Sequence, residues 1–302
     1  MKKIKVIAIF GPTATGKSAL AINLAKILKS EIISADSIQI YKEFNICTAK
    51  PTNQELSQVK HHLINCLPVT EDYSVMHFCQ KAKLIIENLN LQKKIPIIVG
   101  GTGFYIDALI RNYQFVTAPA QRSNCSSDVL FDNLQKIDPS SAASICKNDI
   151  KRLQRALDFY ESFGISITSQ AAKTLSSESI YDAIRIGVNY IDRKKLYKKI
   201  DERVEKMLES GLINEIKFVK DNFNVSKTAR MAIGYKELIP FLEGKISLSQ
   251  AVAELKMKTR RYAKRQITWF KREPNTKWFY QDRNFTFEDF LKHEVLLESI
   301  VP

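Results

Sequence analysis

The sequence predicts an α/β fold in which a parallel sheet is flanked by helices, with an inserted, mostly helical subdomain and a helical C-terminal region. Four short runs rich in Ile and Val are typical of buried parallel strands; they are residues 6–10, 32–34, 95–99 and 184–190. Residues 18–28 and 75–89 between them carry apolar side chains at helical spacing. This alternation of strand and helix is the pattern of a doubly wound sheet.

The rest of the chain departs from this alternation in two places. From about Arg193 onward no strand is predicted, and two long helical patterns cover residues 193–223, interrupted at Gly211, and 247–272. Between residues 113 and 127 the sequence turns polar and irregular before a helical stretch at 128–136. We therefore expect an α/β core formed by residues 1–112 and 184–302, and an inserted helical subdomain at 113–183.

Composition limits the class of protein. The chain has 302 residues, of which 45% are hydrophobic, and 46 Lys and Arg against 32 Asp and Glu give a net charge of +14. Such a surface attracts polyanions, which favours nucleic acid as a partner. The alternative is that the excess of Lys and Arg only keeps the surface solvated. No run of about 18 apolar residues predicts a membrane span, and the apolar start is better explained as a first strand than as a signal peptide.

The five cysteines are an odd number at irregular spacing, which is typical of a reduced, cytoplasmic protein. The nearest approach to a metal signature is His61 and His62 with His77 and Cys79, which lack the paired spacing of a zinc site. We expect no structural metal there. Nothing in the sequence requires more than a monomer.

A phosphate-binding loop follows the first predicted strand and opens the first predicted helix. It fits G-x-x-x-x-G-K-[ST] at every fixed position, with the residues Gly11, Pro12, Thr13, Ala14, Thr15, Gly16, Lys17 and Ser18. Backbone N–H groups, the helix N-terminus and Lys17 would hold a di- or triphosphate, such as a nucleotide, and the Ser18 hydroxyl could reach Mg²⁺. The fold is therefore expected to be of the P-loop type.

Two further segments are expected at the same sheet edge. Asp36 follows the second strand, where a carboxylate beside the phosphate loop is suited to accept a proton from a nucleophile; the alternatives are that it caps a helix or binds Mg²⁺. The third strand ends in "GGTGFY", whose glycines would let the backbone approach a ligand closely, with Thr102 offering a hydroxyl. This strand lacks the terminal acid that a nucleotide hydrolase usually has.

A basic helix is predicted near the C-terminus. Eight Lys and Arg and no acid lie between Lys256 and Arg272, and Arg261, Lys264 and Arg265 share one face, which could follow a phosphate backbone. Aromatic side chains among them are expected mainly to pack into the core. Lys151, Arg152 and Arg155 form a second basic cluster, and two such clusters suggest a ligand larger than a nucleotide.

These segments together resemble the bacterial tRNA dimethylallyltransferase family. The resemblance is carried by several blocks between about residues 4 and 272: "GPTATGKS", "ISADSIQIYKEFNICTAKPT", "IPIIVGGTGFYIDAL", "NDIKRLQRALDFY", "DERVEKMLESGLINEI", "AIGYKEL" and "TRRYAKRQITWFKR". It implies transfer of a dimethylallyl group from its diphosphate to N6 of the adenosine 3′ of the anticodon, in tRNAs that read codons beginning with U.

The resemblance also implies roles for individual residues. The phosphate loop, with Mg²⁺ and Arg203, would hold the diphosphate of the prenyl donor, Asp36 would be the general base, and Thr102 would contact the reacting centre. The implied tRNA contacts are Asp36, Ser37, Ile38, Gln39, Arg122, Lys151, Arg152, Leu153, Gln154, Arg155, Arg260, Arg261, Lys264 and Arg265. The target base would leave its stack to reach such a site.

The sequence departs from the family pattern in two places, and three other functions stay open. The segment 113–131 is shorter than usual, and Met231 stands where many relatives have a polar residue. An adenylate isopentenyltransferase would prenylate a free nucleotide and would not need the basic helix. A small-molecule kinase would transfer the γ-phosphate of ATP, and a non-catalytic RNA-binding protein would not depend on Asp36.

Overall fold

A computed structural model describes residues 3–116, 125–169, 179–273 and 275–295. The chain divides into two compact units, of which the first consists of residues 1–109 and 181–302 and the second of residues 110–180. The insertion predicted from the composition, 113–183, lies within three residues of this division at each end. The two units are described separately below.

The first unit is built on a parallel sheet, which has six strands in the described residues and the order β3-β2-β4-β1-β5-β6. Parallel pairing aligns Ile7 with Ile97 and with Ile184 across the central strands. The strands are β1 (Ile4–Phe10), β2 (Ile32–Ser34), β3 (His61–His62), β4 (Ile97–Gly100), β5 (Tyr181–Asn189) and β6 (Lys277–Tyr280). All four strands predicted from apolar runs are confirmed, with ends shifted by up to three residues.

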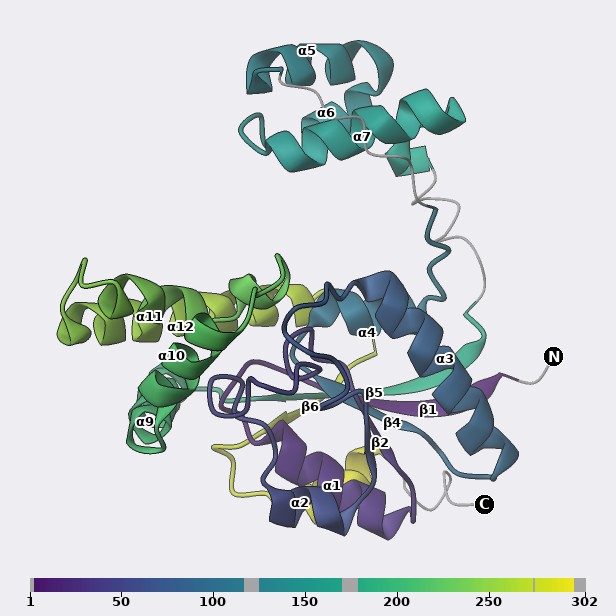
Figure 1. The fold of residues 1–302 in the computed structure, drawn as a ribbon. Helices are drawn as coiled ribbons and strands as arrows, with labels where there is room; N and C mark the ends of the chain where they lie inside the picture. The colour runs from purple at the N-terminus through teal and green to yellow at the C-terminus, as the bar shows by residue number, and fades with distance from the viewer. Residues whose placement is uncertain (1–2, 117–124, 170–178, 274, 296–302) are drawn as a thin grey trace. The chain divides into compact units, whose positions relative to one another are not determined.

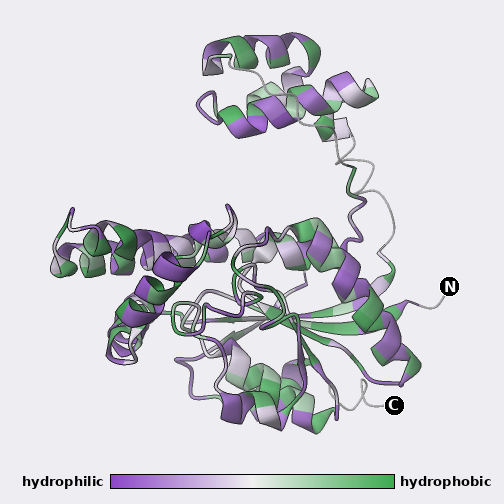
Figure 2. Cartoon of the chain, in the orientation of Figure 1, coloured by the Kyte–Doolittle hydropathy of each residue, from purple (hydrophilic) through white to green (hydrophobic). Residues whose placement is uncertain are grey.

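Helices cover both faces of this sheet (Figure 1). On one face α1 (Lys17–Ile27) and α13 (Phe287–Phe290) pack with the strands in one buried core, which contains Ile7, Leu24 and Phe290. The opposite face carries α3 (Val75–Leu91) and α4 (Gly103–Ile110). Figure 2 shows hydrophobic residues along the strands and both kinds of residue on the helices, as expected for a sheet buried on two sides. The predicted fold class is confirmed.

Four further helices lie beyond the carboxyl ends of the strands (Figure 1). They are α9 (Arg193–Glu209), α10 (Leu212–Asn222), α11 (Tyr235–Leu242) and α12 (Leu248–Phe270). Gly211, in the left-handed region with φ of 95°, separates α9 from α10 at the predicted interruption. Short elements complete the unit: α2 (Asn53–Gln58), the 3₁₀ turn η1 (Ala229–Met231) and the π turn η2 (Leu291–Val295).

The second unit is a small helical bundle with its own core. It contains α5 (Ser127–Ile137), α6 (Pro139–Ser144) and α7 (Ile150–Phe163). Leu130, Leu134, Leu153 and Leu157 form the centre of this core. Each helix begins at a side-chain cap, for example Asp149, whose carboxylate accepts the N–H of Arg152 at 3.2 Å.

The sequence analysis missed two strands. The expectation of no strand after Arg193 is wrong, because β6 pairs with β5 at the sheet edge. Its four residues are too few for a periodic signal, but Phe279 enters the core and the Trp278 ring lies against Gly187, where a Cβ would be 2.6 Å from the ring. The two-residue β3 is shorter still. Among the described helices, none is long and apolar enough to cross a membrane.

Candidate functional site

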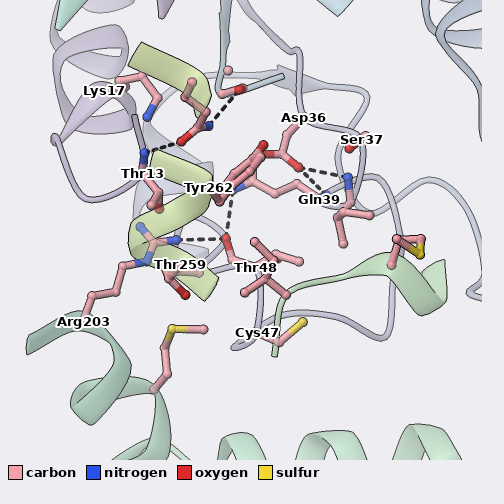
Figure 3. Close-up of a pocket in the computed structure, with 18 of the residues that line it drawn as sticks. Thr13, Lys17, Asp36, Ser37, Gln39, Cys47, Thr48, Arg203, Thr259 and Tyr262 are labelled. Atoms are coloured by element: carbon pink, nitrogen blue, oxygen red, sulfur yellow. Dashed lines mark hydrogen bonds between the residues drawn. The ribbon is translucent and has the colours of Figure 1, made fainter. Parts of the chain in front are cut away.

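A cavity of about 350 Å³ lies where the carboxyl ends of the strands meet α9 and α12 (Figure 3). Its polar side is formed by Thr13, Lys17 and Ser18 of the phosphate loop and by Asp36 to Gln39 after β2. Arg203 of α9 and Thr259, Tyr262, Arg265 and Gln266 of α12 close it from the other side. The structure therefore brings the predicted phosphate loop, Asp36 and Arg203 to one site.

The phosphate loop adopts a strained path that its glycines allow. Gly11 has a φ of 154°, and a Cβ there would be 2.1 Å from the carbonyl oxygen of Val188. Gly16 has a φ of 75° and precedes Lys17, the first residue of α1. The Thr15 hydroxyl donates to the Pro12 carbonyl at 2.9 Å, and the Gln281 side chain donates to the Thr15 carbonyl at 2.8 Å. The predicted strand, loop and helix order of the motif is thus present.

Two cations share the cavity at close range. Burial and the charge of Arg203 lower the pKa of Lys17 to about 7, while Asp36 opposes this shift. The Lys17 ammonium donates to the Pro12 carbonyl at 2.6 Å. Burial also lowers the pKa of Arg203, whose guanidinium donates to the Thr48 carbonyl at 3.2 Å. An anion between Lys17 and Arg203 would relieve their repulsion, so the cavity suits a phosphate group.

Asp36 holds a turn with one of its two carboxylate oxygens. Oδ1 accepts the backbone N–H groups of Ile38 at 2.9 Å and Gln39 at 3.2 Å (Figure 3). In the described residues no helix begins at this turn, so Asp36 holds a turn and is not a helix cap. For Oδ2 the described residues provide no hydrogen bond, so this oxygen is left to face the cavity that Asp36 lines.

Thr102 supports the same turn from behind. Its hydroxyl oxygen accepts the backbone N–H of Ser37 at 3.1 Å, and the Thr102 side chain opposes part of the rise that burial causes in the pKa of Tyr262. Of the two, only Tyr262 lines the cavity in the part of the chain that the structure describes. Thr102 therefore lies next to the expected reacting centre and fixes the backbone that carries Asp36 and Ser37.

The glycines of the second loop have a packing role besides the predicted one. Gly100 and Gly101 line the cavity, so their close approach to a ligand stays a prediction, and a Cβ on Gly100 would lie 2.1 Å from the Ala35 carbonyl oxygen. A Cβ on Gly101 would lie 2.4 Å from Gln266 Nε2, and one on Gly103 would lie 2.4 Å from the Trp269 ring. These glycines make room for the neighbouring strand and for α12.

Sequence reasoning missed two residues of α12 that belong to the site. Gln266 is buried; its Oε1 accepts the N–H of Thr13 at 3.0 Å, and its Nε2 donates to the Gly101 carbonyl at 2.8 Å. It thereby joins the phosphate loop to the second loop. Tyr262 was expected to pack into the core, but it lines the cavity, where burial raises the pKa of its hydroxyl. Their position four residues apart, on the face opposite Lys264, was the available signal.

The basic residues of α12 fall into two groups. Arg260 makes two hydrogen bonds to Asp201 of α9, at 2.6 and 2.8 Å, and Lys256 pairs with Glu205 of the same helix. Arg261, Lys264 and Arg265 instead line a surface hollow of about 410 Å³ together with Thr268, Trp269 and Arg272. The predicted cationic face is thus present, but α9 supplies acids that neutralise the other face.

The second unit presents a basic surface on α7. Lys151, Arg152 and Arg155 are exposed, while Gln154 donates to Asp158 at 2.8 Å. Leu153 is fully buried in the core of this unit, so the expectation that it contacts tRNA is wrong. Its hydrophobic side chain, placed among the basic residues of α7, already indicated that this position faces the core of the unit. Arg122 lies outside the described residues.

Comparisons with known proteins agree on one family. The model of the IPP transferase family matches residues 39–273. The chain belongs to the IPP transferase family. It is 40% identical to the tRNA dimethylallyltransferase of Caldanaerobacter subterraneus subsp. tengcongensis, with 95% of each chain covered, and 45% identical to that of Carboxydothermus hydrogenoformans, with 91% covered. The family resemblance inferred from the sequence is confirmed.

Solved structures of the same family have the same fold. The full-length tRNA isopentenylpyrophosphate transferase of Bacillus halodurans superimposes with a TM-score of 0.76 at 35% identity, covering 99% of this chain and 97% of that one. A eukaryotic dimethylallyltransferase acting on tRNA superimposes with a TM-score of 0.84 at 29% identity, covering 99% of this chain and 80% of that one. The chain therefore has the fold of these IPP transferases over nearly its whole length.

Proposed function

We propose that this IPP transferase moves a dimethylallyl group from dimethylallyl diphosphate to N6 of the adenosine 3′ of the anticodon, in tRNAs that read codons beginning with U. The single observation that carries the proposal is the cavity in which Lys17, Arg203 and Asp36 meet. It offers an anion site beside a carboxylate. Family membership and the basic surfaces on α12 and α7 support tRNA as the acceptor.

The phosphate loop holds the diphosphate of the prenyl donor in this proposal. Lys17 and Arg203 supply positive charge, and Ala14 to Ser18 supply backbone N–H groups at the N-terminus of α1. Mg²⁺ typically binds through one or two protein ligands together with phosphate oxygens, and the Ser18 hydroxyl on the cavity wall fits that role. When bound, the cation would add charge neutralisation to the leaving diphosphate.

Asp36 then accepts the proton of the attacking amine at Oδ2. The nitrogen N6 forms a bond to the allylic carbon, the bond from that carbon to the diphosphate oxygen breaks, and the electron pair leaves with the diphosphate. The amine proton goes to the carboxylate, whose other oxygen keeps the 36–39 turn in place. Thr102 orients this turn through Ser37.

The acceptor base reaches the cavity after extrusion from the anticodon loop. Gln39 reads its edge in this proposal, and its amide is oriented by the Thr48 carbonyl at 3.2 Å. The hollow at Arg261, Lys264 and Arg265 and the exposed cations of α7 contact the RNA backbone. Monomeric state and cytoplasmic location stay predictions.

Incubation with labelled dimethylallyl diphosphate, Mg²⁺ and unmodified tRNA tests the proposal, with label expected in the anticodon loop. AMP in place of tRNA tests the adenylate alternative, and ATP labelled in its γ-phosphate tests the kinase. Label on AMP but not on tRNA, or transfer of the γ-phosphate alone, would overturn the assignment.

Asp36→Asn separates the two proposed roles of the Asp36 carboxylate, which are to hold the 36–39 turn and to accept the proton. Asparagine still accepts the N–H groups of Ile38 and Gln39 through its carbonyl oxygen but cannot take up a proton. We expect the transfer rate to fall by about 10² to 10⁴ while tRNA affinity is kept. Single-turnover kinetics and filter binding measure the two quantities. A variant as fast as wild type would exclude Asp36 as the base.

A further inference from the structure

Residues 45–50 form a turn that separates two cavities, and this turn is fixed by a residue far away in the sequence. The N–H of Ala49 donates to the Ile46 carbonyl at 2.8 Å, and that of Lys50 to the Asn45 carbonyl at 3.1 Å. Cys47, Thr48 and Ala49 line the catalytic cavity, and the other side of the turn lines a neighbouring cavity. The position of the 45–50 turn therefore shapes the wall of the site.

The Thr48 carbonyl lies at the centre of this turn and orients two site residues. It accepts a hydrogen bond from Arg203 Nη2 at 3.2 Å and another from Gln39 Nε2 at 3.2 Å (Figure 3). A displaced turn would remove the acceptor that holds the buried guanidinium of Arg203. Since Arg203 lies beside Lys17, such a shift would reach the phosphate site.

Glu215 of α10 holds the beginning of the turn. Its Oε2 accepts the N–H groups of Asn45 at 2.9 Å and Ile46 at 2.8 Å, and its Oε1 accepts that of Cys47 at 2.9 Å. Three successive backbone donors thus converge on one carboxylate. Hydrogen bonds to a charged acceptor are stronger than neutral ones, so Glu215 is a strong anchor for the 45–50 turn.

We propose that Glu215 is a positioning residue for the prenyl donor, acting through the Thr48 carbonyl on Arg203. The inference rests on the proposed function, because it takes Arg203 as a ligand of the diphosphate. Glu215 itself does not line the catalytic cavity within the described residues. A glutamine could not replace it, because its NH₂ group would face one of the three N–H donors. Cys47 is buried, so an unpaired N–H there is costly.

Glu215→Gln tests this role, with Asp221→Asn as the matched control. Both changes turn an acid into its amide on α10, but Asp221 is exposed and its ion-pair partner is Lys220, 3.9 Å away. We expect Glu215→Gln to raise the KM for dimethylallyl diphosphate about tenfold, which corresponds to the loss of one hydrogen bond to a charged group. The Kd for tRNA should change less than this KM, because most of the proposed RNA contacts lie on α12 and α7, and Asp221→Asn should match wild type in both quantities.

A double-mutant cycle distinguishes positioning from a general loss of structure. If Glu215 acts through Arg203, Glu215→Gln should add little to the KM increase already caused by Arg203→Ala. The inference would be overturned if Glu215→Gln and Arg203→Ala raised the KM independently, so that their effects multiplied in the double variant. It would also be overturned if Glu215→Gln had the same KM as Asp221→Asn. Glu215→Asp keeps the negative charge on a shorter side chain, so its KM should lie between those of wild type and Glu215→Gln. It replaces Glu215→Gln in the cycle if the glutamine variant does not fold. Absence of prenyl transfer by wild type would instead overturn the proposed function.

Discussion

Lys17 illustrates how a single residue can make phosphate binding depend on pH. Burial and Arg203 lower its pKa to about 7 in the free protein. A bound diphosphate favours the charged ammonium and raises this pKa, so the stabilising charge is present below pH 7 without proton uptake. As pH rises above 7, binding must take up a proton, and the contribution of Lys17 to affinity declines.

The corresponding prediction is proton uptake on diphosphate binding at pH 8. Calorimetric titration with diphosphate in buffers of different ionisation enthalpy measures it. Lys17→Arg is the control, because an arginine stays protonated and leaves only the protons taken up by the ligand itself. Equal uptake by wild type and Lys17→Arg would show that Lys17 is already charged in the free protein.

Residue types at the site were predictable, but their partners were not. The spacing of Gly11 to Ser18 is local in the sequence, so the phosphate loop could be recognised. Gln266 contacts Thr13 across 253 residues, and Glu215 contacts Asn45 across 170. The spacing of Gln266 from Tyr262 marked a shared helix face but not the loop that this face contacts, and Glu215 has no local pattern that distinguishes it from other polar residues on a helix. Such contacts depend on how the helices pack against the sheet.

At the scale of elements, one face of α12 lines the catalytic cavity and another presents basic side chains on the surface. Gln266 and Tyr262 face the cavity, Arg260 pairs with Asp201 of α9, and Lys264 lies in the exposed hollow. The helical period was predictable from the sequence, as was the cationic face. The ion pairs between α12 and the acids of α9 were not predictable, because the residue spacing within one helix does not show which other helix packs against it.

Lys264→Ala should therefore change tRNA binding, whereas Arg260→Ala should change the stability of the protein. We expect Lys264→Ala to weaken tRNA binding and to lower the slope of log Kd against log salt by roughly 0.7 to 0.9, the share of one phosphate contact. Arg260→Ala should leave that slope unchanged and lower stability by at most about 1 kcal/mol, because its ion pair with Asp201 is partly exposed. Filter binding over a range of salt and urea unfolding measure the two effects. A reduced slope for Arg260→Ala would place that residue on the RNA instead.

At the scale of the whole molecule, two units with separate cores share one chain. The change in composition near residue 113 predicted the insertion, but apolar runs alone could not predict β6, which needs the edge of β5 to exist. In the second unit the ends of the inserted segment meet, since the Ser179 hydroxyl donates to the Ile110 carbonyl at 2.6 Å. A short linker can therefore join positions 110 and 179 without straining the sheet.

Replacing residues 111–178 with a short Gly-Ser linker should leave the first unit folded. Among the described residues, the core that contains Ile7 and Phe290 and the lining of the catalytic cavity both belong to the first unit. We expect diphosphate to bind the shortened protein as it binds wild type, as measured by calorimetry. Affinity for tRNA should fall at least about tenfold, because the cations Lys151, Arg152 and Arg155 are removed and each phosphate contact contributes to binding. Unchanged tRNA affinity would show that the insertion does not contact tRNA, whereas lost diphosphate binding would show that the first unit depends on it.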